Sequence, residues 1–164
     1  MDPGTTVTGY GVVETAEAGE FRLVECGVIR PAGGGTLADR LCQVHEEIGG
    51  LLARHRPEVL AVEQAFHARN ARTTLVLGQA CGVILLAGAQ AGVVIAEYPP
   101  AVVKKTVTGR GGALKPQVGF MVAQLLRLRQ APAPGDAADG VAVALTHLLR
   151  RRPVRAPGSG GRQL

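Results

Sequence analysis

Short apolar runs separated by polar turns dominate the first third of the chain, a pattern typical of β-strands. Residues 7–14 and 21–30 are rich in β-branched and apolar side chains, and the segment AEAGE at 16–20 separates them. These two runs predict a β-hairpin. Further short apolar runs at 59–63 and 93–97 predict two more strands.

Between the predicted strands, apolar residues recur at helical spacing. One such series comprises Leu37, Leu41, Val44, Ile48 and Leu51, and Pro57 ends the helix that it predicts. Further helices are predicted over residues 72–91, from Pro99 through Lys105, over 115–127 and over 136–150. Strands that alternate with helices predict an α/β fold.

Glycines within the helix predicted at 72–91 interrupt an otherwise apolar segment. Gly78, Gly82 and Gly88 lower the intrinsic helicity of this segment, so they indicate close packing against a neighbouring element. Gly140 in the last predicted helix is expected to loosen that helix by up to about 1 kcal/mol.

Length and composition are those of one globular domain. The 164 residues, 46% of them hydrophobic, can bury a sizeable core. We expect a domain over residues 1–150 and a disordered basic tail over 151–164, which is rich in Pro, Gly and Arg. No apolar run is expected to be long enough to span a membrane and no signal peptide is recognised, so the predicted location is the cytoplasm.

Charge is distributed unevenly along the chain. The net charge is +5, and from Arg54 to Arg129 ten basic residues stand against three acidic ones. This region can present a positive face to a polyanion such as nucleic acid. Basic side chains that only solvate helices explain the same charge pattern equally well.

Four carboxylates stand where a metal site needs them. Asp2 precedes a Pro-Gly turn, Glu63 ends an apolar strand, and Asp136 and Asp139 lie three residues apart at the start of the last predicted helix. The last two therefore share one helix face. An Asp at a helix start is most often a cap, but capping does not explain Glu63. Oxygen ligands of this kind suit Mg²⁺.

Several ordered motifs resemble the RuvC family of Holliday-junction resolvases. The motifs are DPGTTVTGYGVV from Asp2, VEQAFHARN from Val62, LGQA from Leu77 and DAADG from Asp136. The resemblance runs from Asp2 to about Arg150. It implies a ribonuclease-H-like fold, with a mixed five-stranded sheet flanked by helices, and a homodimer that cuts two strands of like polarity at a four-way DNA junction.

The resemblance also implies roles for individual residues. Asp2, Glu63, Asp136 and Asp139 match the catalytic carboxylates, which would hold two Mg²⁺ ions per subunit, with Mn²⁺ as a possible substitute. The residues expected to contact DNA are Phe66, Arg69, Lys104 and Lys115. The branch-migration complex RuvA-RuvB is the further partner implied. From its distance along the helix, His147 is expected to have a structural role.

One departure from the family pattern concerns the first strand. Family members carry a short apolar strand ahead of the first aspartate, whereas here only Met1 precedes Asp2. We therefore expect a truncated central strand, a recorded sequence that begins late, and weak or absent cleavage by the 164 residues alone. Two alternatives stay open: another ribonuclease-H-like nuclease that acts on RNA, and a junction-binding protein without activity.

Overall fold

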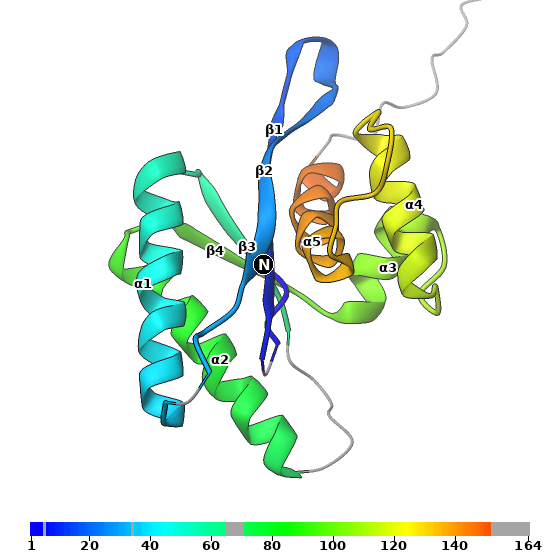
Figure 1. Cartoon of the computed structure of the whole chain (residues 1–164). Coiled ribbons are helices and arrows are strands. Elements are labelled where there is room, and N and C mark those ends of the chain that lie inside the picture. Colours follow the sequence, from blue (N-terminus) through cyan, green and yellow to red (C-terminus); the bar gives the residue numbers. More distant parts are fainter. Residues whose placement is uncertain (5, 34, 65–70, 152–164) are drawn as a thin grey trace, which may run out of the picture.

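The computed structural model describes residues 1–4, 6–33, 35–64 and 71–151. Within these residues four strands and five α-helices alternate in the order that the sequence predicts (Figure 1). The strands are β1 (Thr8–Thr15), β2 (Phe21–Ile29), β3 (Val59–Glu63) and β4 (Val94–Tyr98), and a 3₁₀ turn, η1 (Glu17–Gly19), joins the first two. The helices are α1 (Leu37–His55), α2 (Ala71–Gln90), α3 (Pro100–Thr108), α4 (Lys115–Leu125) and α5 (Gly135–Arg151).

The strands form two pairs, with the first two residues of the chain between them. β1 and β2 are antiparallel, and β3 and β4 are parallel. Asp2 and Gly9 exchange backbone hydrogen bonds of 2.8 and 3.0 Å, which ties Asp2 to β1. On its other side, the Met1 ammonium donates to the Ala61 carbonyl at 2.7 Å, and the Glu63 N–H donates to the Met1 carbonyl at 2.9 Å.

Met1 and Asp2 therefore stand at the position of a central strand. The expected α/β fold is confirmed, but the described residues contain four strands rather than the five of the expected sheet. The spatial order is β2, β1, the Met1–Asp2 segment, β3 and β4. Asp2 pairs with β1 and Met1 pairs with β3, so this two-residue segment joins the two strand pairs.

Helices cover both faces of the strands (Figure 1). α1 and α2 pack on one face, over a core that includes Ile48, Leu52, Val62 and Ile84. α3, α4 and α5 pack on the other face, and α5 lies directly against β1. The domain thus has three layers: α1 and α2, the strands, and α3 to α5. The site described below lies at the ends of the strands.

Local sequence explains where α1 begins and ends. Thr36 caps its first turn, since the Thr36 hydroxyl accepts from the Asp39 N–H at 3.2 Å and the Asp39 carboxylate accepts from the Thr36 N–H at 2.8 Å. Such a capping box satisfies two N–H groups that the first turn leaves without helical partners. At the other end Arg56 adopts a left-handed conformation, and Pro57 cannot continue the helix.

Glycines allow α5 to lie unusually close to β1. A Cβ on Gly140 would come within 2.5 Å of the Gly9 carbonyl carbon and of the Tyr10 nitrogen. A Cβ on Gly9 would in turn collide with the Asp136 carbonyl. The close packing of α5 on β1 therefore requires glycine at position 140. This corrects the expectation, based on helix propensity alone, that Gly140 only loosens the helix.

Replacing Gly140 with alanine should destabilise the fold by about 3 kcal/mol, because the methyl group would meet backbone atoms that cannot step aside. Chemical denaturation measures this change in the free energy of unfolding. Gly49→Ala in α1 is the matched control: a Cβ at Gly49 meets nothing within 4 Å, so alanine should stabilise by up to about 1 kcal/mol. Equal effects of the two substitutions would contradict the packing argument.

The glycines of α2 divide into two groups. Gly88 packs closely on Leu60 and Ile95, as the sequence predicted. Gly78 and Gly82 do not: a Cβ on either would meet nothing within 4 Å in the described residues. Their expected packing partner is therefore absent from the described part of this chain.

α2 is also long and apolar enough to cross a membrane, by length and composition alone. This finding corrects the expectation that no apolar run reaches that length. The inner face of α2 belongs to the core, since Cys81, Ile84 and Ala87 are buried with residues of α1 and β3. A core helix passes the same test, so the finding is weak evidence for a membrane.

Candidate active site

Three separate parts of the fold carry the four carboxylates. Asp2 lies between β1 and β3, Glu63 ends β3, and Asp136 and Asp139 lie in the N-terminal part of α5. The predicted placements at a strand end and at a helix start are thus confirmed. The glycine contacts between α5 and β1 bring the start of α5 beside Gly9, which is paired to Asp2.

Electrostatics shows that the carboxylates act on one another. Burial, and next the charge of Asp139, raise the pKa of Asp2 to about 6. Burial, followed by the charges of Asp2 and Asp139, raises the pKa of Glu63 to about 7. Burial and like charges both disfavour an ionised carboxyl group. The site therefore concentrates negative charge, which a bound cation would stabilise.

Lys115, at the start of α4, supplies a cation from the chain itself. Its Nζ donates to Asp136 Oδ1 at 3.1 Å and lies 2.7 Å from Asp139 Oδ2. The two carboxylates, Asp139 foremost, hold the pKa of Lys115 above its usual range. Apart from this ion pair, the buried Asp139 Oδ2 has no hydrogen-bond partner in the described part of the chain.

The four carboxylates suit a divalent metal ion by their chemistry, although their side chains do not converge on one point. Among the described residues, no three His, Cys, Asp or Glu side chains are grouped closely enough to hold a metal ion. The chemistry nevertheless fits, because hard carboxylate oxygens are the preferred ligands of Mg²⁺. The raised pKa values of Asp2 and Glu63 point the same way.

The other predicted residues fall in different places. Lys104 lies in α3, close enough for its charge to oppose the rise in the pKa of Glu63. Phe66 and Arg69 lie outside the described residues. His147 is linked to the β4 end, where its Nδ1 and the Tyr98 hydroxyl are 2.7 Å apart. This contact agrees with the structural role expected for His147.

Sequence reasoning missed the contribution of Met1 to the site and the ion pairs that Lys115 makes there. The positive charge of the Met1 ammonium opposes the rise in the pKa of both Asp2 and Glu63. Lys115 was expected to approach DNA phosphates, whereas here it lies on the carboxylates of α5. Its position at a helix start, where a cation opposes the dipole, was the available signal.

A three-layer α/β domain with carboxylates at a central strand, a neighbouring strand end and a helix start has the construction of a metal-dependent nuclease. Comparison with known proteins gives the family. Residues 1–147 match the family model of crossover junction endodeoxyribonuclease RuvC. The chain belongs to this family, and the resemblance noted in the sequence is confirmed.

Individual relatives agree with the family model. Crossover junction endodeoxyribonuclease RuvC of Pelotomaculum thermopropionicum is 50% identical over 147 residues, which cover 90% of this chain and 89% of the relative. The structure described as T. thermophilus RuvC in complex with Holliday junction substrate is 34% identical, with a TM-score of 0.80 and 90% of each chain covered. A second structure of Thermus thermophilus RuvC is 37% identical, with the same TM-score and coverage.

Proposed function

We propose that this chain is a Holliday-junction resolving endonuclease, which makes paired symmetric nicks in four-way DNA junctions during recombination and repair. The observation that carries the proposal is the placement of Asp2 between β1 and β3, Glu63 at the end of β3 and Asp139 near the start of α5, where the charge of Asp139 acts on both other carboxylates. Membership of the family supports it over a nuclease that acts on RNA and over a protein that only binds junctions.

The carboxylates of Asp2, Glu63, Asp136 and Asp139 would hold Mg²⁺, two ions per subunit, with Mn²⁺ as a substitute. When bound, the metal supplies a nucleophilic water and stabilises the leaving oxygen of the phosphodiester. Dependence on a metal goes with the family to which the chain belongs, whereas the number and kind of ions are our proposal.

The chain's own residues prepare this chemistry. Asp2 and Glu63 must lose their protons before they can bind a cation, and their raised pKa values mean that binding releases protons near neutral pH. Without metal, the Lys115 ammonium pairs with the carboxylates of Asp136 and Asp139. A divalent cation would displace it. Once released, its ammonium can contact a DNA phosphate close to the cleaved bond.

Replacing Lys115 with methionine should separate these two roles. Without the ammonium, the carboxylates lose a competing cation, so Mg²⁺ should bind several-fold more tightly in calorimetry without DNA. Junction affinity should fall, because one phosphate contact is lost. Lys105→Met on α3 serves as the control. Unchanged Mg²⁺ affinity in Lys115→Met would show that the ammonium of Lys115 does not compete with the metal ion.

DNA contacts beyond Lys115 are proposed for Phe66, Arg69 and Lys104. The place of Lys104 near Glu63 supports a phosphate contact beside the carboxylates. Phe66 and Arg69 follow Glu63 in the sequence, so a stacking ring and a guanidinium can reach the same DNA region. The branch-migration complex RuvA-RuvB is the proposed further partner, in the cytoplasm.

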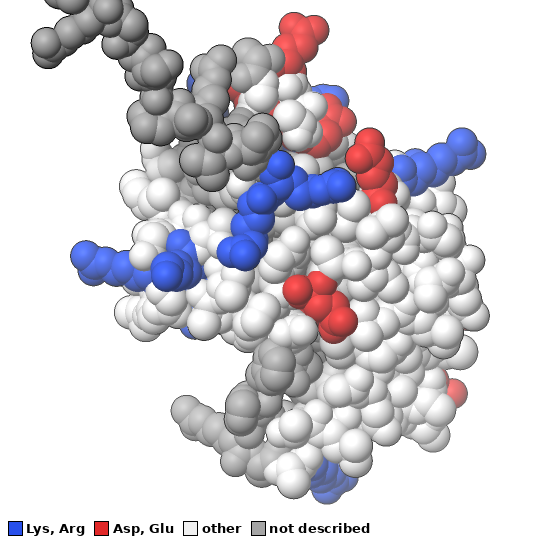
Figure 2. Space-filling view, turned by 180° about the vertical axis from the view of Figure 1, so that it is seen from behind, with Lys and Arg blue, Asp and Glu red and all other residues white. Residues whose placement is uncertain are grey.

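A homodimer is proposed through the outer face of α2. Leu75 and Leu86 there are 64% and 52% exposed, and Gly78 and Gly82 lie on the same face. α2 carries a single charged residue, Arg72. Figure 2 shows one side of the molecule, on which uncharged side chains predominate. Exposed apolar side chains beside glycines allow two helices to approach closely.

Gly82→Leu should weaken this dimer, because the added side chain would enter the contact between the two helices. The Cβ meets nothing within the described chain, so the fold itself should tolerate the change. Sedimentation velocity measures the monomer fraction and thermal melting checks the fold. Gly50→Leu on α1, also at an open position, is the control. A stable dimer in Gly82→Leu would contradict the proposed interface.

Two further parts of the proposal concern the limits of the domain. The nuclease domain spans residues 1–150, and the basic segment 151–164 follows it; apart from Arg151, this segment lies outside the described residues. The complete sheet has five strands, and its central strand includes Met1 and Asp2. The pairing of these two residues with both β1 and β3 supports this arrangement.

Cleavage of a synthetic four-way junction tests the proposed function. The chain is incubated with labelled junction, linear duplex or RNA–DNA hybrid, with and without Mg²⁺, and the products are mapped. Paired nicks at symmetric positions of the junction alone support the proposal. Cleavage of the hybrid instead favours a nuclease that acts on RNA, and tight junction binding without nicks at any Mg²⁺ concentration favours a binding protein.

A further inference from the structure

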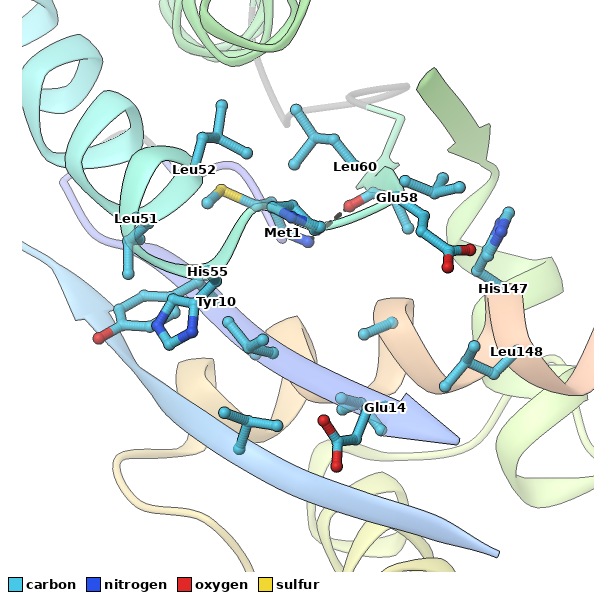
Figure 3. Close-up of a pocket in the computed structure, with 18 of the residues that line it drawn as sticks. Met1, Tyr10, Glu14, Leu51, Leu52, His55, Glu58, Leu60, His147 and Leu148 are labelled. Atoms are coloured by element: carbon cyan, nitrogen blue, oxygen red, sulfur yellow. Dashed lines mark hydrogen bonds between the residues drawn. The ribbon is translucent and has the colours of Figure 1, made fainter. Parts of the chain in front are cut away.

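One side-chain hydrogen bond joins α5 to the strand pair β3–β4. The Tyr98 hydroxyl, at the end of β4, lies 2.7 Å from His147 Nδ1 on α5, and the two rings meet edge to face with their centroids 6.0 Å apart. Figure 3 shows His147 extending from α5 toward β4. Among the described residues, no second side-chain hydrogen bond links α5 with β3 or β4. This contact is therefore the directional link between them.

Tyr98 is the residue of β4 that stands beside Glu63. The two residues pair in the parallel register of β3 and β4, and the Gln64 N–H donates to the Tyr98 carbonyl at 2.9 Å. Tyr98 packs on the core formed with α3, α4 and α5, and so does Ala61, two residues before Glu63. Because side chains alternate along a strand, Glu63 and Tyr98 both face α5. The placement of Tyr98 therefore determines the placement of the strand end that carries Glu63.

His147 lies on the helix that carries the two aspartates of the site. It follows Asp136 by about three turns, so both side chains lie on one face of α5. Near the aspartates, the close contact of Gly140 with Gly9 holds α5 against β1. Further along, the bond from His147 to Tyr98 holds the same helix against β4. The helix is thus held on both sides of the site, by β1 and by β4.

The surroundings of His147 leave Tyr98 as the group that orients its ring. His147 Nε2 is buried, and it has no hydrogen-bond partner within the described part of the chain. Burial, and next the charge of Arg151, lower the pKa of His147. The neutral ring therefore predominates at pH 7, and a neutral imidazole can accept the Tyr98 hydroxyl proton at Nδ1.

We propose that Tyr98 and His147 are positioning residues for the metal ligands: their hydrogen bond holds the end of β3 and β4 against α5 and so sets the spacing between Glu63 and Asp139. Neither residue contacts metal or DNA in this role. The assignment rests on the proposed function, because that function makes the carboxylates metal ligands. Mg²⁺ demands near-ideal octahedral geometry, so the spacing of its ligands decides how tightly it binds.

Tyr98→Phe removes the hydroxyl alone. Calorimetry without DNA should show Mg²⁺ affinity about tenfold weaker, as when an outer partner of a metal ligand is lost. The Mg²⁺ concentration for half-maximal junction cleavage should rise by the same factor, with the rate at saturating Mg²⁺ within about twofold. Hydrogen exchange should speed up more at the Gln64 amide than at the amides of β1, because the change loosens the strand end and not the whole fold.

Tyr10→Phe is the matched control. It also removes a partly buried hydroxyl, one that donates to Glu25 at 2.8 Å on the α1 side of the sheet. It should leave both Mg²⁺ affinity and exchange at the Gln64 amide unchanged. Thermal melting checks that each variant folds. An equal loss of Mg²⁺ affinity in the two variants would overturn the proposal, since it would reflect lost stability alone.

Variants of His147 test whether the two residues act through one bond. His147→Asn places an amide oxygen near the position of Nδ1 and should keep most of the Mg²⁺ affinity, whereas His147→Leu should lose as much as Tyr98→Phe. The double variant should lose no more than either single one, and additive losses would overturn the proposal. Junction cleavage with unchanged Mg²⁺ affinity in Tyr98→Phe would overturn it too, and leave the proposed function standing. Mg²⁺ binding without cleavage by the unchanged chain would contradict the proposed function alone.

Discussion

Replacing Glu63 with glutamine should slow the Mg²⁺-dependent cleavage of a four-way junction by at least about a hundredfold, because the site loses a charged ligand at the end of β3. Junction binding should persist, since Glu63 opposes a phosphate rather than attracting it. Single-turnover cleavage and electrophoretic binding assays measure the two effects separately. Glu97→Gln on β4 is the matched control on a neighbouring strand. Cleavage by Glu63→Gln at the rate of the unchanged chain would remove this residue from the catalytic set.

The same substitution should also change how stability depends on pH. Because the folded-state pKa of Glu63 is about 7 and its ordinary value is 4.5, the folded protein binds more protons between these limits than the unfolded chain. Without metal, the melting temperature should therefore fall as pH rises from about 4.5 to 6, and Asp2 adds a similar fall from 3.8 to about 6. Above pH 6 the Met1 amine, whose pKa burial lowers from 8.0 to about 6, opposes the remaining fall due to Glu63. Glu63→Gln should flatten the upper part of this profile. Saturating Mg²⁺ should oppose the fall, because it binds the ionised form.

The elements of the fold were predictable because local pattern determines them. The apolar run of β3, the capping box of α1 and the proline that follows it all act within a few residues of one another. The same holds for two of the site's features. A charged residue that ends an apolar strand and two aspartates three residues apart on a helix are local signals, and they predicted correctly that Glu63 ends β3 and that Asp136 and Asp139 lie near the start of α5.

What the sequence did not predict depends on contacts between distant segments. The collision that excludes a Cβ at Gly140 involves Gly9 and Tyr10, which lie far away in the chain. From helix propensity alone, Gly140 was expected to loosen the last helix. The ion pairs of Lys115 with Asp136 and Asp139 likewise arise only when α4 and α5 pack together. The openness around Gly78 and Gly82 is a property of the folded surface, so sequence spacing could not reveal it.

Adding a short apolar strand ahead of Met1, such as Val-Ile-Val-Val, should raise the melting temperature by about 10 °C, because several buried side chains outweigh the entropy of ordering them. The cavity of about 480 Å³ between β1 and β3, here called the slot, is lined by Leu51 and Leu52 of α1 and by Ala144 and Leu148 of α5. Within the described residues, the β1 and β3 edges that face it have no strand neighbour beyond Met1 and Asp2. The added residues would replace the buried Met1 amine, whose pKa burial lowers to about 6, by a peptide N–H, which can keep the hydrogen bond to Ala61. Differential scanning calorimetry measures the shift.

Junction cleavage should increase together with stability, because Asp2 would then lie within a continuous strand rather than one residue from a chain end. The matched control carries Asp-Lys-Asp-Lys in place of the four apolar residues, which have no favourable place between α1 and α5. It should melt no higher than the unextended chain and cleave no faster. If both extensions stabilise equally, the slot does not select an apolar strand. If the apolar extension stabilises the protein but leaves cleavage unchanged, the Met1–Asp2 segment is already positioned well enough by its four backbone hydrogen bonds to β1 and β3.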